Sequence, residues 1–150
     1  MRAGGRRSKQ ASVNQITSPQ NQRVKEVAKL AKRSVRDERR LTVVEGLREA
    51  GHALANGVIP VEAYFCPTVV NPPDRPLFSQ LREQLVAQPG VLSFEVTPDV
   101  FAKLAYRAES DGVLLVVPYL DCHLSRLPLR DNPFLCVMEG VEKPGSLGAI

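Results

Sequence analysis

Segments typical of β-strands alternate with segments typical of α-helices along most of this 150-residue chain, and this order most constrains its fold. Short apolar runs at residues 41–44, 61–66, 91–96 and 112–117 predict four strands, and the last of them (GVLLVV) is expected to be fully buried. Strands that alternate with helices form a mostly parallel or mixed sheet with helices on both faces. The order therefore predicts a small α/β domain with a sheet between two helical layers.

Three helices are expected between these strands. The first spans residues 47–55, where the turn residues Asn56 and Gly57 end it. The second contains leucines four residues apart, and the third starts at Thr97-Pro98, because proline is favoured at the first helical position. The apolar positions of these two helices are Leu77, Leu81, Leu85, Val100, Phe101 and Leu104.

A longer helix is expected before the first strand, over residues 19–39. Ser18 is a suitable N-cap for it, and Pro19 is a suitable first helical residue. Apolar residues then recur at helical spacing and predict one buried face. They are Val24, Val27, Ala28, Ala31 and Val35.

Positive charge is concentrated at the N-terminal end of the chain. Residues 1–40 carry 12 Lys and Arg against 3 Asp and Glu, a balance of +9, whereas residues 41–150 carry 8 against 13, a balance of −5. If these charges served only solubility, they would not need to be clustered, because charges scattered over the surface keep a protein soluble equally well. A polyanion is therefore expected as a partner, and nucleic acid is the first candidate.

Eight of these cations lie off the apolar face of the expected helix or directly after it, where they can contact phosphates. A solvated helix surface is the ordinary interpretation of a charge run, but the excess of one sign favours nucleic-acid contact. Phosphate contacts alone do not distinguish RNA from DNA. The predicted nucleic-acid-binding residues are Arg23, Lys25, Lys29, Lys32, Arg33, Arg36, Arg39 and Arg40.

Composition divides the chain into four parts. Residues 1–15 are rich in Gly, Ser and Arg and predict a flexible basic arm, and residues 16–117 form the first domain. Residues 118–132 contain two prolines and both signs of charge, which predicts a linker. Residues 133–150 begin with an apolar run, 134–138, that is expected to be a buried strand. One strand and one helical turn cannot bury their apolar faces alone, so this part is expected to be a fragment of a second domain.

Several other classes of site and protein are disfavoured. No apolar run approaches the roughly 20 residues of a membrane-spanning helix, and the basic N-terminus lacks a signal-peptide core, so a cytoplasmic protein is expected. The widely spaced Cys66, Cys122 and Cys136 indicate neither a disulfide framework nor a metal site, and buried thiols are expected. Most aromatic residues fall on core positions. Tyr106, beside Arg107, is the aromatic residue expected to be available for base stacking.

Three stretches of the chain, at 16–25, at 42–46 together with 112–117, and at 137–150, resemble in this order the SpoU/TrmH family of RNA ribose 2′-O-methyltransferases in the SPOUT superfamily. The first, ITSPQNQRVK at 16–25, is similar to the opening helix of the family's substrate-binding domain. The second, TVVEG at 42–46, resembles a family strand that ends in Glu-Gly, and the run at 112–117 resembles the strand that closes that domain. The third, VMEGVEKPGSLGAI at 137–150, resembles the first motif of the catalytic domain, usually Asp-Pro-Gly-Asn-x-Gly-Ala-Ile.

The third stretch departs from the family's pattern at two positions. Lys143 stands where aspartate is common, and Ser146 stands where the family has asparagine. Glu45 matches a position that the family characteristically fills with glutamate. The family-motif positions of the chain are Glu45, Gly46, Pro144, Gly145, Ser146 and Gly148.

The resemblance implies a methyltransferase that uses S-adenosylmethionine and acts on RNA, with ribosomal RNA as the expected substrate. Residues 16–117 would be the RNA substrate-binding domain, with the fold of ribosomal and kink-turn-binding proteins. Residues 133–150 would be the truncated start of the knotted SPOUT domain. It also implies that the catalytic arginine and the cofactor pocket lie beyond Ile150, so that the 150 residues alone are inactive, and that the complete protein is a homodimer.

Two alternatives remain at this point: a non-catalytic RNA-binding protein and a plain interaction module. Neither a catalytic residue nor a metal ligand is predicted within the chain. An arginine and Gly-rich cofactor motifs shortly after Ile150 would favour the enzyme, whereas a stop codon there would favour the RNA-binding protein. An interaction module predicts no RNA affinity, whereas both other hypotheses predict RNA binding that weakens steeply with salt.

Overall fold

The computed structural model describes residues 13–107, 110–120 and 123–140. The chain divides into two units, Met1–Tyr119 and Leu120–Ile150. The first unit contains β1 (Asn14–Ile16), α1 (Gln22–Ala28), the 3-10 turn η1 (Lys29–Ala31), α2 (Arg33–Arg39), β2 (Leu41–Glu45), α3 (Leu47–Ala55), β3 (Glu62–Phe65), the 3-10 turns η2 (Pro67–Val69) and η3 (Pro72–Asp74), α4 (Arg75–Ala87), β4 (Leu92–Val96), α5 (Pro98–Leu104) and β5 (Val113–Pro118).

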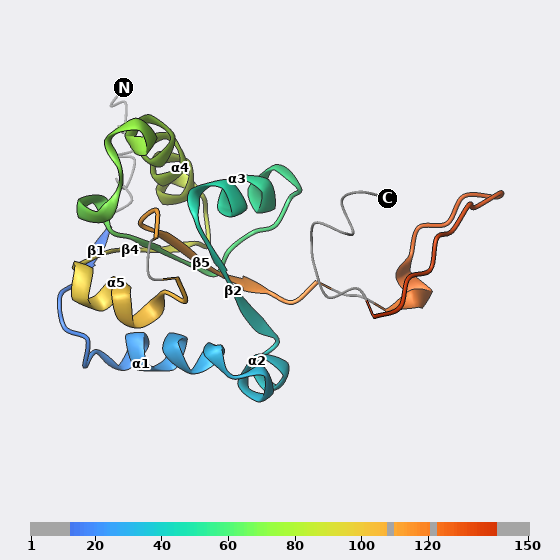
Figure 1. Cartoon of the computed structure of the whole chain (residues 1–150), viewed down its shortest axis with the longest axis horizontal. Helices are drawn as coiled ribbons and strands as arrows, with labels where there is room; N and C mark the ends of the chain where they lie inside the picture. Colours follow the sequence, from blue (N-terminus) through green and yellow to red (C-terminus); the bar gives the residue numbers. More distant parts are fainter. Residues whose placement is uncertain (1–12, 108–109, 121–122, 141–150) are drawn as a thin grey trace, which may run out of the picture. The chain divides into compact units, whose positions relative to one another are not determined.

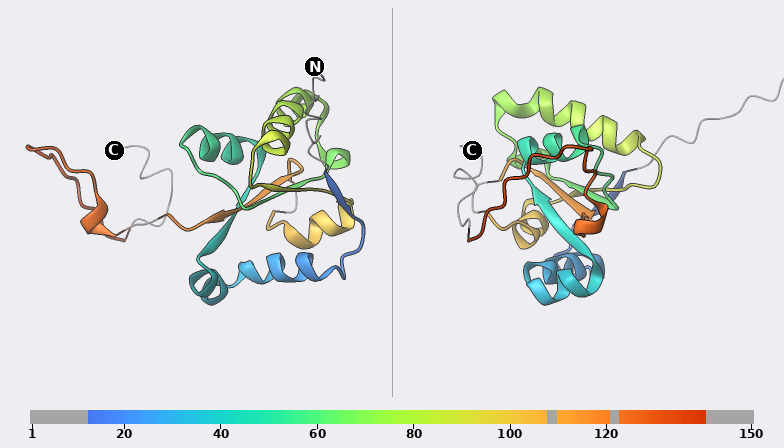
Figure 2. Two further views of the ribbon diagram at one scale, coloured as in Figure 1. Left: turned by 180° about the vertical axis from the view of Figure 1, so that it is seen from behind. Right: turned by 90° about the vertical axis from the view of Figure 1, so that its right-hand side faces the viewer.

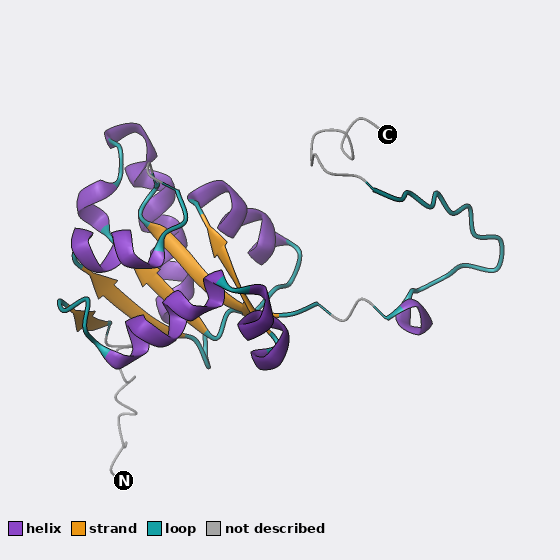
Figure 3. Cartoon of the chain, turned by 60° about the horizontal axis from the view of Figure 1, so that its bottom comes forward, coloured by secondary structure: helices purple, strands orange, loops and turns teal. Residues whose placement is uncertain are grey.

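A mixed five-stranded sheet forms the centre of this unit, with the strand order β1-β4-β3-β5-β2. Strands β1, β4 and β3 are parallel, whereas β5 is antiparallel to both of its neighbours, β3 and β2. The five apolar residues 113–117 of β5 are all buried, as the run GVLLVV predicted. The α/β class and the mixed sheet are therefore confirmed, and Figure 3 shows the strands side by side.

Helices cover both faces of the sheet and enclose two apolar clusters. Helices α1, α2 and α5 lie on one face, and α3 and α4 lie on the other (Figures 1 and 2). Val24, Leu30 and Val100 belong to the first cluster. Leu81 and Leu85 of α4 belong to the second. The expected three-layer architecture follows from strands whose side chains are apolar on both faces.

The single helix expected over residues 19–39 is wrong, because the chain breaks it at Lys32. Lys32 has an extended backbone (φ −85°, ψ 128°) between η1 and α2. In a continuous helix, Leu30 and Val35 would point about 140° apart, since each residue turns by about 100°. The break lets Leu30 and Val35 pack on the same apolar cluster, while Ala31 is exposed.

The start of this segment also differs from the prediction. Asn21, and not Ser18, caps α1, since its side chain accepts a hydrogen bond from the Arg23 amide at 2.9 Å. Ser18 instead begins a turn in which its carbonyl accepts a hydrogen bond from the Asn21 amide at 3.0 Å. Pro19 lies inside that turn.

Part of the segment expected to be a flexible arm belongs to the sheet. Asn14–Ile16 form the edge strand β1, in which Ile16 is buried and pairs with Val96 of β4. Three residues are too short to show an alternating pattern in the sequence. Residues 1–12 of the expected arm lie outside the described part of the chain.

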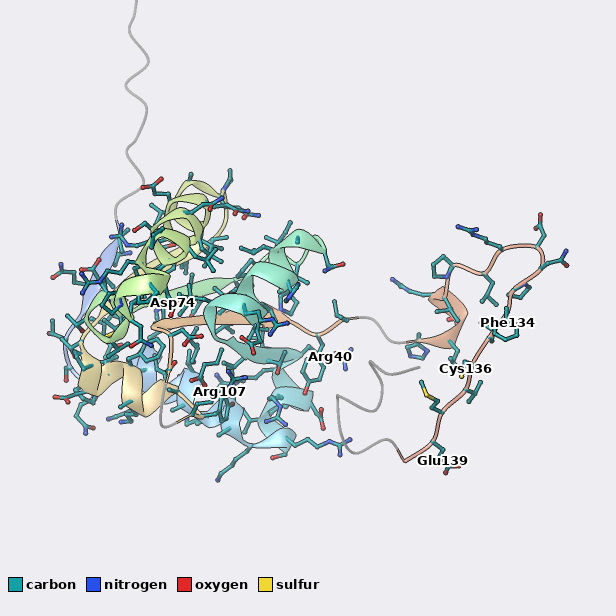
Figure 4. All side chains as sticks on the ribbon, turned by 45° about the horizontal axis from the view of Figure 1, so that its top comes forward. Arg40, Asp74, Arg107, Phe134, Cys136 and Glu139 are labelled. Atoms are coloured by element: carbon teal, nitrogen blue, oxygen red, sulfur yellow. The ribbon has the colours of Figure 1, made fainter. Side chains whose placement is uncertain are left out.

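In the second unit, the structure describes Leu120 and residues 123–140. They contain one 3-10 turn, η4 (Leu124–Arg126), and no strand. The buried strand expected at 134–138 is wrong, because Phe134 is 97% exposed and no described strand pairs with this segment. Figure 4 shows the side chains of Phe134 and Cys136 along it.

The cysteine prediction has three outcomes. Cys66 at the end of β3 is buried, as expected, but Cys136 is exposed, so that prediction is wrong there. The cause is the missing strand at 134–138, which leaves its side chains without a core. Cys122 lies outside the described residues. None of the described helices is long and apolar enough to cross a membrane.

Candidate nucleic-acid interface

The eight predicted RNA-binding cations lie on α1, η1, α2 and the turns beside them, and we call this set the α1–α2 basic surface. Arg23 of α1 faces the sheet, where its guanidinium pairs with the Glu62 carboxylate and stacks over the Phe94 ring at 4.9 Å. Glu62 also accepts a hydrogen bond of 2.5 Å from the Tyr64 hydroxyl, and burial together with this carboxylate raises the pKa of Tyr64. Arg23 therefore fastens α1 to the sheet.

Glu26 neutralises two further cations of this surface. One carboxylate oxygen accepts a hydrogen bond of 2.6 Å from Lys29 Nζ, and the other accepts one from the Arg39 guanidinium. These hydrogen bonds, that from Lys29 first, lower the pKa of Glu26 from 4.5 to about 2. Glu26 thus holds α2 against α1 as a charged bridge.

Three arginines of α2 and its end have other partners. Arg33 lies 3.6 Å from Asp37 in an exposed ion pair one helical turn away. The Arg36 guanidinium donates hydrogen bonds of 2.8 Å to the carbonyls of Leu30 and Ala31, which the helix break leaves without helical partners. Arg40, with a left-handed backbone (φ 55°), stacks over the Tyr119 ring at 5.0 Å.

The remaining two cations are Lys25 and Lys32. Within the part of the chain that the structure describes, neither side chain has an ion-pair or hydrogen-bond partner. A phosphate can bind these two ammonium groups without competing against a carboxylate. The structure thus separates the predicted set into cations held by internal partners and cations available at the surface, and Arg33, whose ion pair with Asp37 is exposed, belongs with the available ones.

Glu45 and Gly46 lie at the junction of β2 and α3. Glu45 is 8% exposed, and its Oε2 accepts a hydrogen bond of 2.7 Å from the backbone amide of Tyr106. Gly46 has φ 109°, and a Cβ there would collide with the Glu49 carboxylate. Glu45 therefore positions the backbone that follows α5, and Gly46 lets the chain turn sharply into α3.

An exposed ion pair lies beside this junction. Arg107 Nη2 donates a hydrogen bond of 3.1 Å to Glu49 Oε1. The pKa of Glu49 is lowered, first by a hydrogen bond from its own amide and then by Arg107. Tyr106 is 53% exposed, and partial burial raises the pKa of its hydroxyl although Arg36 lies beside it. Figure 4 labels Arg40 and Arg107.

Only some of the predicted site residues lie in the part of the chain that the structure describes. Pro144, Gly145, Ser146 and Gly148 lie outside the described residues, as do all of residues 141–150 of the stretch that resembles the first catalytic motif. Residues 123–140 before it are all exposed, so they cannot by themselves enclose S-adenosylmethionine. Among the described residues, no group of three His, Cys, Asp or Glu side chains could hold a metal ion.

Two residues that matter for this interface were missed in the sequence. Glu62 is 39 positions from Arg23, and Glu49 is 58 positions from Arg107. No local pattern links residues at such separations, since only the pairing of strands brings them together. Glu26 was visible in the sequence as a nearby acid, but its double pairing depends on the break at Lys32.

A protein-family model matches most of the first unit. Residues 21–115 match the MRM3-like substrate binding domain. No curated protein matches the chain. The matched range starts at α1 and ends within β5. It therefore includes the α1–α2 basic surface and the ion pair of Arg107 with Glu49.

Solved structures of methyltransferases have the same fold. The crystal structure of an RNA 2′-O ribose methyltransferase is 30% identical, with a TM-score of 0.63 over 90% of this chain and 49% of its own. An rRNA methyltransferase from Sinorhizobium meliloti is 26% identical, with a TM-score of 0.59 over 72% of this chain and 38% of its own. The SpoU methyltransferase AviRb from Streptomyces viridochromogenes with bound AdoMet also shares the fold. It is 20% identical, with a TM-score of 0.57 over 74% of this chain and 40% of its own. This chain thus spans less than half the length of each.

Proposed function

Because the chain belongs to the SpoU/TrmH family, and residues 21–115 are its MRM3-like substrate-binding domain, we propose that it supplies the RNA-binding part of a ribose 2′-O-methyltransferase. The complete protein would use S-adenosylmethionine and act on ribosomal RNA as a cytoplasmic homodimer. The alignment with an RNA 2′-O ribose methyltransferase over 90% of this chain carries the proposal.

The described residues suit substrate binding and not methyl transfer itself. Contacts with parts of an RNA remote from the reacting ribose supply binding energy that positions one nucleotide for reaction. Lys25 and Lys32 are placed to contribute such contacts through phosphates. S-adenosylmethionine would supply the electrophilic methyl group, and no described residue is assigned to hold it.

RNA binding measured against salt concentration tests this proposal. We expect the purified chain to bind a labelled ribosomal RNA fragment with an affinity that falls steeply between about 50 and 200 mM salt. Each phosphate contact contributes roughly 0.7 to 0.9 to the slope of log affinity against log salt concentration. Absence of binding even in dilute buffer would refute the proposal for this chain. Methylation of the same RNA by the complete gene product, with labelled S-adenosylmethionine, tests the enzymatic part.

A further inference from the structure

A hollow of about 210 Å³ lies beside α5 in the described part of the first unit. Its described walls are mainly apolar and include two polar residues, Arg107 and Ser110. We propose that this hollow receives one unpaired base of the RNA substrate. The proposal rests on the proposed function and deepens it. The apolar wall residues are Val69, Pro98, Phe101, Ala102 and Ala105.

The size and the lining of the hollow suit a single base. Pockets for drug-sized ligands have volumes of roughly 300–1,000 Å³, so a hollow of about 210 Å³ suits a smaller flat group. The faces of a base are apolar and pack well against walls of this kind. Its edges carry hydrogen-bond donors and acceptors. Within the described residues, the Ser110 hydroxyl is buried and has no hydrogen-bond partner, so a rotation that turns it into the hollow would let it bond to a base edge.

Other hollows on the same unit have a different charge pattern. A groove of about 480 Å³ between α1 and the sheet is lined by Arg23 and Arg39, but also by Glu26 and Glu62, which pair with them. Among its described lining residues, a hollow of about 250 Å³ at the ends of β1 and β4 includes Glu95 and no cation. Among the described residues, the lining of the hollow beside α5 has one guanidinium, that of Arg107, and no carboxylate, because its partner Glu49 lies outside this lining. A nucleotide fits this charge pattern, with its base in the hollow and its phosphate at Arg107.

Arg107 at this hollow can exchange its present partner for a phosphate. Its ion pair with Glu49 is 3.1 Å long, and both side chains are about half exposed (55% and 42%). Exposed ion pairs of this kind contribute little to stability, so breaking one costs little. A nucleotide with its base in the hollow would therefore present its phosphate to a cation that is free to reorient.

Two described backbone positions near the hollow are held in place. Glu45 fixes the Tyr106 amide, and Gly112, with φ +75°, packs against the Cys66 carbonyl and the side chains of Val69 and Val70. A site whose frame is already in place loses less conformational entropy when its ligand binds. The occupant is an unpaired base and not a duplex, because a paired base stays in its stack and cannot enter a recess.

Filling the hollow with a large side chain tests the proposal. Ala102 is an exposed residue of α5 that lines it, so Ala102→Trp should occupy the space. Ala55 of α3 is the matched control, because it is also exposed and lines a hollow of about 240 Å³ between α3 and α4 whose described lining residues carry no charge. The probes are a hairpin with an unpaired loop and a fully paired duplex of equal length.

We expect Ala102→Trp to weaken hairpin binding roughly tenfold, the scale of one lost base-stacking contact, and to leave duplex binding unchanged. The salt slope should stay the same, because no phosphate contact is removed. Ala55→Trp should bind both probes as the unchanged chain does. Circular dichroism checks that each variant folds, and Ala102→Leu replaces the tryptophan variant if it does not.

The outcomes distinguish this inference from the proposed function. If the unchanged chain binds neither RNA, the proposed function and this inference both fail. If it binds RNA with a steep salt dependence but the folded Ala102 variant binds the hairpin equally well, only the inference fails. Equal weakening by Ala102→Trp and Ala55→Trp would also overturn it, since the effect would not belong to this hollow.

Discussion

The α1–α2 basic surface and the region around Arg107 differ in how their charges are arranged. The first holds eight cations, but Glu26 and Glu62 pair with three of them. Arg36 donates hydrogen bonds to backbone carbonyls, and Arg40 stacks over an aromatic ring. The second has few cations, yet Arg107 lies at an apolar hollow and its pairing is exposed. The number of cations in a segment therefore does not tell how many can bind phosphate. Their partners in the folded chain decide it.

The largest effect that we predict concerns the frame of the hollow. Gly112→Ala should lower the free energy of unfolding by about 3 kcal/mol or more, because a left-handed backbone costs an alanine roughly 1–2 kcal/mol and the new Cβ would lie 2.5 Å from the Cys66 carbonyl. Urea unfolding measures the change. If the variant is as stable as the unchanged chain, the second region is not held as rigidly as we argue.

Gly57→Ala is the control for this prediction. Gly57 also has a left-handed backbone (φ +77°), but nothing lies within 4 Å of its missing Cβ. Only the conformational cost remains, so we expect a loss of about 1 kcal/mol. Equal losses at both positions would mean that the contact with Cys66 is unimportant.

The fold was largely predictable from the sequence, because its signals are local. The buried run of β5, the Pro98 start of α5 and the helix over 47–55 all depend on neighbouring residues, and the structure confirms them. The break at Lys32 was not predictable. It depends on Leu30 and Val35 packing on the same sheet face, a tertiary requirement that overrides the helical spacing. The strand expected at 134–138 is wrong for the converse reason. Its apolar pattern is a local signal, but a strand also needs a neighbouring strand with which to pair.

Less of the candidate site could be predicted. The sequence identified Glu45 as a family position, but its hydrogen bond to the Tyr106 amide joins residues 61 positions apart. It identified Arg23 as a phosphate ligand, whereas the structure places its guanidinium on Glu62 and Phe94. Composition determines how many cations a segment carries, but the fold determines which of them are available to bind a phosphate.

A second prediction separates the two kinds of cation within the α1–α2 basic surface. Arg23→Gln should lower the free energy of unfolding by about 1–2 kcal/mol, because it leaves the partly buried Glu62 without its cation. It should leave the salt slope of RNA binding unchanged. Lys32→Gln should do the reverse: it should reduce the slope by roughly 0.7 to 0.9 with no loss of stability. A smaller salt slope for Arg23→Gln at full stability would contradict this division.

The smallest predicted effect is a pH dependence that comes from Glu26. Its pKa is lowered from 4.5 to about 2 by hydrogen bonds from Lys29 and Arg39. The ionised carboxylate therefore stabilises the folded chain above about pH 4.5, and this contribution is lost as the pH falls towards about 2. Glu26→Gln should lower the Tm near neutral pH, and the difference from the unchanged chain should shrink as the pH falls through this range.

Glu83→Gln is the control, since it removes the same charge from an exposed residue of α4 for which the structure describes no ion pair. Its Tm should stay close to that of the unchanged chain at every pH. Glu26→Gln also frees Lys29 and Arg39, so RNA affinity at low salt should rise and the salt slope should steepen. If the slope stays the same, the pairing with Glu26 is not what withholds these two cations from phosphate, and their position on the surface must be the reason instead.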